Sequence, residues 1–507
     1  MNMKTLLHSL KLLAIIAVLF AGCKGDTGDV GPQGPQGPEG PQGPDGPDGP
    51  QGPGLVQLAN HSATSTFVKK LPGFESLEVY SLVGSADVLE ESPDYVFGGS
   101  ADGSGLMATN EGYVMLVNNE DNYAVSRLYF DETFRPVRGE YLLNSDGGQW
   151  RLCSATLATQ EEHGFGPLYL TCGESGPESR THGIHPTDPA SNAGTSRELA
   201  GLGRWSAENA VPLSSNAFSG KTVIIIGDDD SGTYGGQVAM YVSSTVGDLE
   251  NGDLYALRRV DKNTTETDMV SGTEYEVEFV KLEDHKNLTG EQLNMKSQEL
   301  NAMPFGRVED IDYRKGGGAH SREIYFNVTG QYNSGANADY SRSKYGRVYK
   351  LVLDANDPLK GKLSLVLNGD DRGGIAKTFQ NPDNICVTTN FVYVQEDPNG
   401  YGDETHDSYI YQYNIATGVL KKVVELDHDR DNPASDEVYG GYSARLGGWE
   451  YGSLVDVSDV LGIPNTFTLC IQPHTWRKEE FKGVDGGSKR QDQDQGSQIV
   501  VIRGLPR

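Results

Sequence analysis

Short acidic clusters lie beside predicted β-strands at five places along the chain. They are VNNE at 117–120, LTCGE at 170–174, GDD at 227–229, RVE at 307–309, and PDN at 382–384 with QED at 395–397 on the two sides of one strand. Carboxylate and amide oxygens are the ligands that calcium prefers, and a cysteine thiolate beside them suits iron or zinc. If these strand ends meet in the fold, the clusters form a site for metal ions. The alternative is that each cluster is a solvated turn.

The sequence around these clusters is typical of β-strands. Short runs of β-branched and aromatic residues are separated by turns rich in Gly, Asp and Asn. The runs cover residues 112–117, 221–226, 323–328, 347–353, 391–394, 408–413, 467–471 and 498–502. A helical pattern covers residues 288–303, with Thr289 near its start. We therefore expect an all-β protein with little helix.

Successive strand pairs between residues 323 and 413 are similar to pieces of propeller blades. A β-propeller repeats four-stranded sheets around a central channel, so strand ends on one face converge. We expect a β-propeller with six blades over residues 55–507. A two-sheet sandwich is the structural alternative, because residues 55–507 show no repeat of fixed period.

The order of the five clusters resembles that of the PhoX-type alkaline phosphatase family. That family carries VNHE-like, LTCEE-like, GDD, RPE and PDN segments in this order, and the similarity covers most of residues 85–480. The resemblance implies a propeller with calcium and iron at its centre that hydrolyses phosphate esters. It implies that Arg307 binds the substrate phosphate, Glu309 bridges metal ions and Cys172 binds iron. The other implied metal ligands are Glu120, Glu174, Asp228, Asp229, Asp383 and Asn384.

The clusters also depart from the family pattern. Gly173 stands where the family has a Glu, Asn119 replaces a His and Val308 replaces a Pro. A further Glu expected after the GDD segment is not evident near residues 235–237. Fewer carboxylates weaken a cluster of several metal ions. These departures keep a second hypothesis open, a non-catalytic, calcium-stabilised propeller that serves binding or display at a surface.

The N-terminus is typical of an exported lipoprotein. Lys4 and Lys11 precede the apolar run LLAIIAVLF at 12–20, which is too short to span a bilayer as a stable helix. The following Ala-Gly-Cys resembles the bacterial lipobox. We predict a signal peptide over residues 1–22 and acylation of Cys23, which would anchor the protein to a lipid bilayer, at the outer membrane or cell surface. An ordinary signal peptide followed by a chance cysteine is the alternative.

Residues 25–54 run in Gly-X-Y triplets, which is the pattern of collagen. We predict that residues 23–54 form a stalk, with a length of about 90 Å if it is fully extended. A collagen triple helix would make the protein a homotrimer. Because every charged residue of the repeat is acidic, a monomeric polyproline II spacer is the alternative.

Composition narrows the range of partners. The net charge of −29 makes nucleic acid a poor partner, because its phosphates would be repelled. Apart from Cys23 there are four cysteines, too few for a disulfide scaffold. Cys153 and Cys172 are close enough in sequence to form a disulfide that closes a short loop, and such a bond would remove the thiolate that iron requires.

Overall fold

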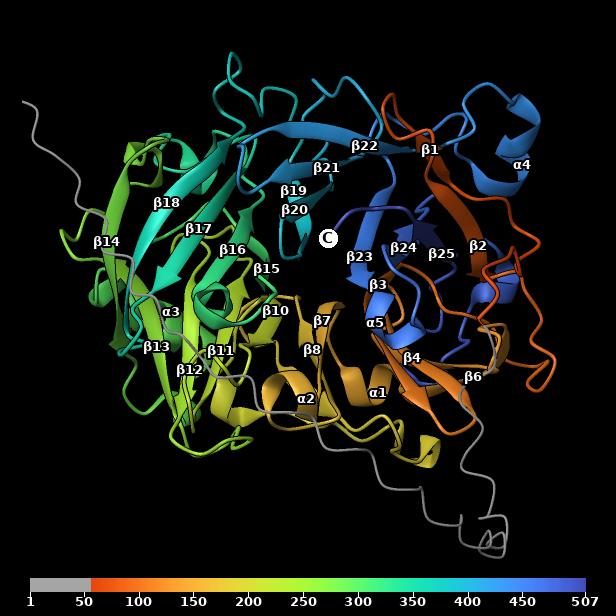
Figure 1. Ribbon diagram of the computed structural model, residues 1–507, viewed down its shortest axis with the longest axis horizontal. Coiled ribbons are helices and arrows are strands. Elements are labelled where there is room, and N and C mark those ends of the chain that lie inside the picture. The colour runs from red at the N-terminus through yellow and green to blue at the C-terminus, as the bar shows by residue number, and fades with distance from the viewer. Residues whose placement is uncertain (1–55) are drawn as a thin grey trace, which may run out of the picture. The chain divides into compact units, whose positions relative to one another are not determined.

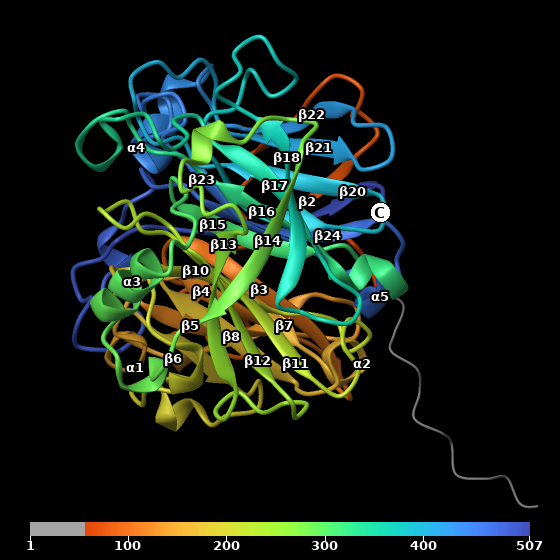
Figure 2. The same ribbon diagram turned by 90° about the vertical axis from the view of Figure 1, so that its left-hand side faces the viewer.

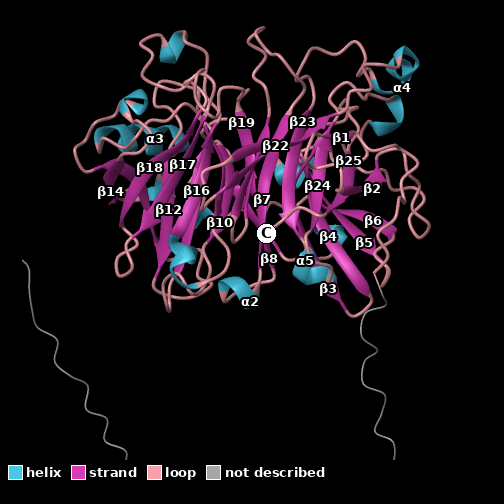
Figure 3. Ribbon diagram, turned by 45° about the horizontal axis from the view of Figure 1, so that its top comes forward, coloured by secondary structure: helices cyan, strands magenta, loops and turns pink. Residues whose placement is uncertain are grey.

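The structure is a computed structural model that describes residues 56–507. The predicted signal peptide at 1–22, the predicted acylation site Cys23 and the predicted stalk at 23–54 lie outside the described residues. Within the described part, strands make up most of the secondary structure (Figure 3). In that part, no helix combines the length and the apolar character that crossing a membrane requires.

The strands of residues 56–507 form five sheets, four of them separate and one composite. The first sheet, in spatial order, contains β2 (Glu78–Gly84), β25 (Gln498–Arg503), β24 (Thr466–Gln472) and β23 (Glu450–Asp456). The second contains β3 (Ala101–Thr109), β4 (Gly112–Asn119), β5 (Ala124–Phe130) and β6 (Pro136–Leu143). The third contains β7 (Leu152–Ala158), β8 (Leu168–Gly173) and β9 (Thr181–Ile184). The fourth contains β1 (Val68–Lys70), β22 (Leu420–Leu426), β21 (Tyr409–Asn414), β20 (Phe391–Glu396) and β19 (Pro382–Val387).

The composite sheet has nine strands. One part contains β10 (Ala207–Pro212), β11 (Thr222–Asp228), β12 (Val238–Ser243), β13 (Asp253–Arg259) and β14 (Glu274–Lys281). The other part contains β18 (Lys360–Asn368), β17 (Arg347–Leu353), β16 (Glu323–Val328) and β15 (Val308–Tyr313). The pairing of β14 with β18 joins the two parts. The observed arrangement is therefore four blades and one joined sheet, where we expected six separate blades.

The sheets stand around a common centre (Figure 1). The strands β3, β7, β10, β15, β19 and β23 each contact the next, and β23 contacts β3 to close the ring. We call these six the inner strands. The prediction of a mostly β, propeller-like fold is therefore confirmed. The ring is fastened by the antiparallel pairing of β2 with β25, which brings strands from the two ends of the described chain into one sheet.

The helices are short and lie at the two ends of the ring (Figure 2). They are α1 (Ser145–Gly148), α2 (Gln160–His163), α3 (Gly290–Glu299), α4 (Asp436–Tyr439) and α5 (Ser458–Leu461). Helices α1, α3 and α4 lie on one side and α2 and α5 on the other. The predicted helix at 288–303 is α3, which begins after Thr289 because the Thr289 side chain accepts the Gln292 N–H in a capping box.

The apolar cores lie between neighbouring sheets. Strand β11 shows why the run KTVIII has no alternation, since both of its faces are buried. Val223 and Ile225 pack into one apolar cluster, whereas Ile224 and Ile226 pack into another. Burial on both faces therefore explains why the apolar run of β11 continues without polar residues until the strand reaches its acidic end.

Candidate metal centre

The inner strands all begin with an acidic or thiol side chain at the same end of the ring. The groups, in chain order, are Asp102, Cys153, Glu208, Glu309, Asp383 and Glu450. Every inner strand also has a register shift at or directly after this position, where it pairs with its neighbour. A β-bulge bends a strand and changes the direction of its side chains. The repeated bulge therefore accounts for how six separate strands present polar groups at one place.

A second set of carboxylates comes from the strands next to the inner ones. These strands run antiparallel to the inner strands, so they end where the inner strands begin. The residues that directly follow β4, β8, β11 and β20 are Glu120, Glu174, Asp229 and Asp397. Each of these four residues donates its backbone N–H to the carbonyl of the residue that directly precedes the neighbouring inner strand. The acceptors are Ser100, Arg151, Ser206 and Asn381, at 2.7–3.0 Å.

The two sets together form groups with the spacing of metal ligands. In each of four groups, one ligand atom per residue lies within 4.8 Å of the others. The groups are Asp102–Cys153–Glu208, Glu120–Cys153–Glu174, Glu208–Glu309–Asp383 and Asp383–Asp397–Glu450. Because the groups share members, they make one continuous cluster, which we call the carboxylate ring.

The structure places most of the predicted site residues in or beside this ring. Glu120, Glu174, Glu309 and Asp383 belong to the groups above. Asp229 contacts the ring through Arg307, as described below. The other two predicted ligands, Asp228 and Asn384, do not belong to these groups. The buried Asp228 carboxylate accepts the Ser206 N–H at 3.0 Å, and the Asn384 amide lies 3.4 Å from the Asp102 Oδ1.

Cys172 is not brought to the carboxylates. Its thiol lies 3.4 Å from the Thr181 hydroxyl, and its side chain packs with Leu170 in an apolar cluster. Strand alternation is the cause, since Cys172 is two residues from Leu170 and so shares its face. The cysteine that meets the ring is Cys153, whose Sγ lies 3.1 Å from Glu174 Oε2. All four cysteines of the described residues are free, so the alternative Cys153–Cys172 disulfide is also wrong.

Sequence analysis missed several members of the ring. These are Asp102, Cys153 as a ligand, Glu208 and Glu450. The available signal was weak: a polar group at the first or second position of a short strand. It becomes informative only when the strand is known to be an inner one.

Burial and mutual repulsion dominate the electrostatics of the ring. Removal from water raises the pKa of six of its carboxyl groups well above their ordinary range, and neighbouring carboxylates add to the shift; the six are Asp102, Glu174, Glu208, Glu309, Asp383 and Glu450. The Asp228 Oδ2 is buried without a hydrogen-bond partner among the described residues. Buried like charges need protons or cations to offset them. Oxygen ligands in this number fit hard divalent cations, and the Cys153 thiol adds one position for a softer metal.

Arg307 lies at the edge of the ring and faces a pocket. Its guanidinium contacts both oxygens of Asp229 at 2.7 and 2.8 Å, Glu309 at 3.0 Å and Asn399 at 2.7 Å. The side chain is 21% exposed. The pocket has a volume of about 470 Å³, and Glu174, Asp229 and Arg307 are among the residues that line it. A cationic fork and the carboxylate ring therefore meet at one solvent-accessible site.

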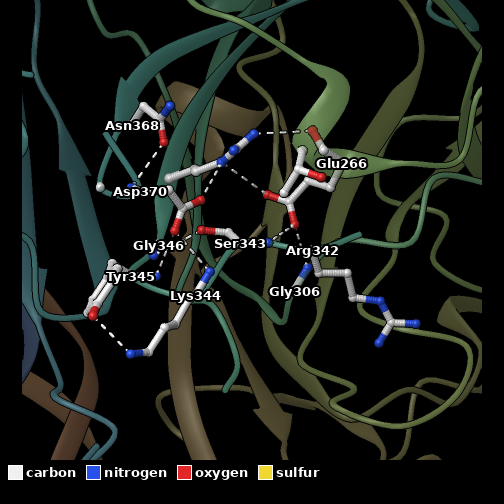
Figure 4. A network of polar contacts seen from close by, with 12 residues as sticks. Glu266, Gly306, Arg342, Ser343, Lys344, Tyr345, Gly346, Asn368 and Asp370 are labelled. Carbon is white, nitrogen blue, oxygen red and sulfur yellow. Dashed lines mark hydrogen bonds and ion pairs between the residues drawn. The ribbon is translucent and has the colours of Figure 1, made fainter. Parts of the chain in front are cut away.

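A buried polar network holds the chain next to Arg307 (Figure 4). The Glu266 carboxylate accepts the Gly306 N–H at 2.9 Å and the Ser343 N–H at 3.0 Å. Arg347 lies beside Glu266 and donates to Asp370 at 3.0 Å. Arg307 itself has a φ of 71°, a left-handed conformation that is unusual for a residue with a side chain. The network provides the support that such a strained residue requires.

Comparison with known proteins identifies the fold. No protein-family model matches the chain, and no curated protein matches it. Among solved structures, the chain is similar to Pseudomonas fluorescens PhoX in complex with vanadate, a transition state analogue. The TM-score is 0.59 at 14% identity, over 89% of this chain and 98% of that one. A post-proline cleaving enzyme from Rickettsia typhi gives a TM-score of only 0.24 at 10% identity, over 78% of this chain and 41% of that one, which is too low to indicate a shared fold. The chain thus shares the propeller-like fold of PhoX.

Proposed function

We propose that the protein is a metal-dependent phosphatase that hydrolyses phosphate esters outside the cytoplasm. The observation that carries this proposal is the position of Arg307, which faces the same pocket as the ring member Glu174 and contacts a second ring member, Glu309. The similarity of the fold to PhoX supports the same class of activity.

The ring residues fit the metal ions that this activity requires. Glu208, Glu309 and Asp383 would hold calcium, and Cys153 with Glu120 and Glu174 would hold iron, because a thiolate suits the softer metal. When bound, such ions offset the charge of a phosphate and activate an oxygen nucleophile. Without cations the pocket would repel a phosphate, since Glu174, Asp229 and Asp230 line it.

Arg307 would bind the phosphate oxygens of the substrate. A guanidinium presents a planar fork that can donate to two oxygens at once. Asp229 and Asn399 hold the fork from the side, and the part of Arg307 that remains exposed faces the pocket. These contacts hold the Arg307 guanidinium in position before the substrate arrives, which reduces the conformational entropy lost on binding.

The alternative is a non-catalytic, calcium-stabilised propeller that serves binding or display at a surface. It is favoured by Gly173, which leaves the segment before Glu174 without a second carboxylate. It is also favoured by the ion pairs of Arg307 with Asp229 and Glu309, since these occupy much of the guanidinium.

We also propose six blades, with β10–β13 and β15–β18 counted separately. The closed ring of six inner strands, each with its bulge, supports this count. The proposed location is outside the cytoplasm, with anchoring through acylated Cys23 and a stalk at 23–54. The mass of the ectodomain with and without residues 25–54 would distinguish a homotrimer from a monomeric spacer.

The proposed function is tested with an Arg307→Ala variant and a phosphomonoester assay. We expect at least a hundredfold loss of kcat, because the variant loses a charged donor to the transferred group, while bound metal is retained. Arg307→Lys should recover only part of the rate, since a lysine cannot donate as a planar fork. Unchanged turnover in Arg307→Ala would refute the assignment of Arg307.

A further inference from the structure

Aromatic rings gather at the rim of the Arg307 pocket. Tyr332 and Tyr401 both line the pocket, and their ring centroids lie 5.3 Å apart with an interplanar angle of 53°. The Tyr345 ring lies 6.5 Å from that of Tyr401. Tyr332 is 53% exposed. An exposed ring at the edge of a polar pocket offers apolar surface that a bound planar group can cover.

Lys344 fixes the arrangement of these rings. Its Nζ lies 5.1, 4.4 and 5.3 Å from the ring centroids of Tyr332, Tyr345 and Tyr401. The ammonium also donates to the Tyr345 hydroxyl at 2.8 Å (Figure 4) and to Asp403 at 3.3 Å. A cation attracts the electron-rich faces of aromatic rings, so Lys344 restricts the directions in which they turn. The rings therefore form a preorganised surface.

Contacts between segments place these tyrosines beside Arg307. The Gly330 N–H donates to the Gly306 carbonyl at 2.8 Å, and Tyr332 follows Gly330 by two residues. Asn399 contacts the Arg307 guanidinium at 2.7 Å, and Tyr401 follows Asn399 by two residues. Both tyrosines therefore line the same pocket as Arg307. A phosphate ester whose alcohol carries a planar ring has groups that match both the guanidinium and the tyrosines.

From this geometry we infer that Tyr332 and Tyr401 bind a planar ring in the alcohol part of the substrate. The inference rests on the proposed function and names its substrate class, phosphate esters of nucleosides or similar ring-bearing alcohols. In the reaction, the oxygen of water forms a new P–O bond and the P–O bond to the alcohol breaks. A proton goes to the departing alcohol oxygen, so the products are the free ring-bearing alcohol and inorganic phosphate.

The test compares two esters that differ only in the ring. Adenosine monophosphate and ribose phosphate, with the phosphate on the same carbon, are hydrolysed by the full-length protein in detergent. We expect kcat/KM to be about tenfold higher for the nucleotide, the effect of one base stacking on an aromatic side chain. The ratio should fall to about one in Tyr332→Ala and persist in Tyr332→Phe. It should also persist in Tyr340→Ala, which removes a tyrosine of similar exposure, 61%, outside the pocket.

The outcomes separate this inference from the proposed function. A ratio near one in the unmodified protein, with both esters hydrolysed, overturns the ring subsite and leaves the phosphatase standing. Hydrolysis of neither ester overturns the phosphatase, and calorimetry of the same two compounds then decides the subsite. Tighter binding of the nucleotide that is lost in Tyr332→Ala supports the subsite, whereas equal binding of both compounds overturns it.

Discussion

Replacing Glu266 with Ala tests whether the network beside Arg307 supports the fold. Glu266 is fully buried. Its carboxylate accepts hydrogen bonds from the Gly306 N–H, the Ser343 N–H and the Tyr349 hydroxyl, at 2.9, 3.0 and 3.0 Å. The Arg347 Nε lies 3.8 Å from the same carboxylate. The substitution therefore leaves two backbone donors without acceptors and removes one partner of a buried cation.

The expected loss in the free energy of unfolding is about 3–5 kcal/mol, the usual range when one partner of a buried charge pair is removed. Three hydrogen bonds to a charged group would give a larger sum, at roughly 1.5–3 kcal/mol each. These contributions are not additive, because the three donors share one carboxylate. Burial also raises the pKa of Glu266, although Arg347 opposes the shift. The free-energy cost of burying the charged carboxylate therefore offsets part of the stabilisation from its hydrogen bonds and its ion pair.

Equilibrium unfolding in urea measures this cost, with the fluorescence of the buried Trp205, Trp449 and Trp476 as the signal. The control is Glu278→Ala. Glu278 pairs with Arg258 at 2.7 Å but has a side chain that is 34% exposed, so we expect a loss below about 1 kcal/mol. If Glu266→Ala costs no more than Glu278→Ala, the network does not support the chain at Gly306 and the reasoning is refuted.

Two further predictions concern Cys153 and Asp310. Cys153→Ser should lower the iron content of the purified protein, whereas Cys172→Ser should leave it unchanged, and equal losses by elemental analysis would contradict the assignment of Cys153. Asp310 tests the pH dependence, because burial raises its pKa from 3.8 to about 6. A carboxyl group with a raised pKa stabilises the fold when protonated, so stability falls as the pH rises from about 4 to 6. Relative to the unmodified, metal-free protein, Asp310→Asn should gain up to about 3 kcal/mol between pH 4 and pH 7 in urea unfolding. A difference that does not change with pH would contradict this expectation.

The strands next to the inner ones could be predicted from the sequence. The run at 323–328 coincides with β16, and the run at 221–226 forms most of β11. Both strands are buried over most of their length, so they appear in the sequence as runs of β-branched and aromatic residues, and β11 ends at a charged residue. For this reason Glu120, Glu174 and Asp229 were found at strand ends, and their proximity to one another followed from the propeller expectation.

The inner strands could not be predicted in the same way. Strand β10 reads AENAVP and β3 begins ADGSG, so neither has the apolar content that marks a strand. Their inward positions are set by the closure of the ring, through contacts between segments far apart in sequence. The same long-range contacts decide that Cys153 lies in the ring. The order of the motifs implied that Cys172 binds iron. Alternation along β8 instead places Cys172 on the face that packs in the apolar core.

The central claim is that the carboxylate ring binds metal ions that phosphate-ester hydrolysis requires. Elemental analysis and a phosphomonoester assay on one purified sample test it directly, before chelation, after chelation and after the metals are returned. We expect bound calcium and iron, turnover that disappears with the metals and recovers with them, and loss of both properties in Glu309→Gln. Turnover that persists in fully metal-free protein, or a Glu309→Gln variant with normal metal content and rate, would contradict the claim.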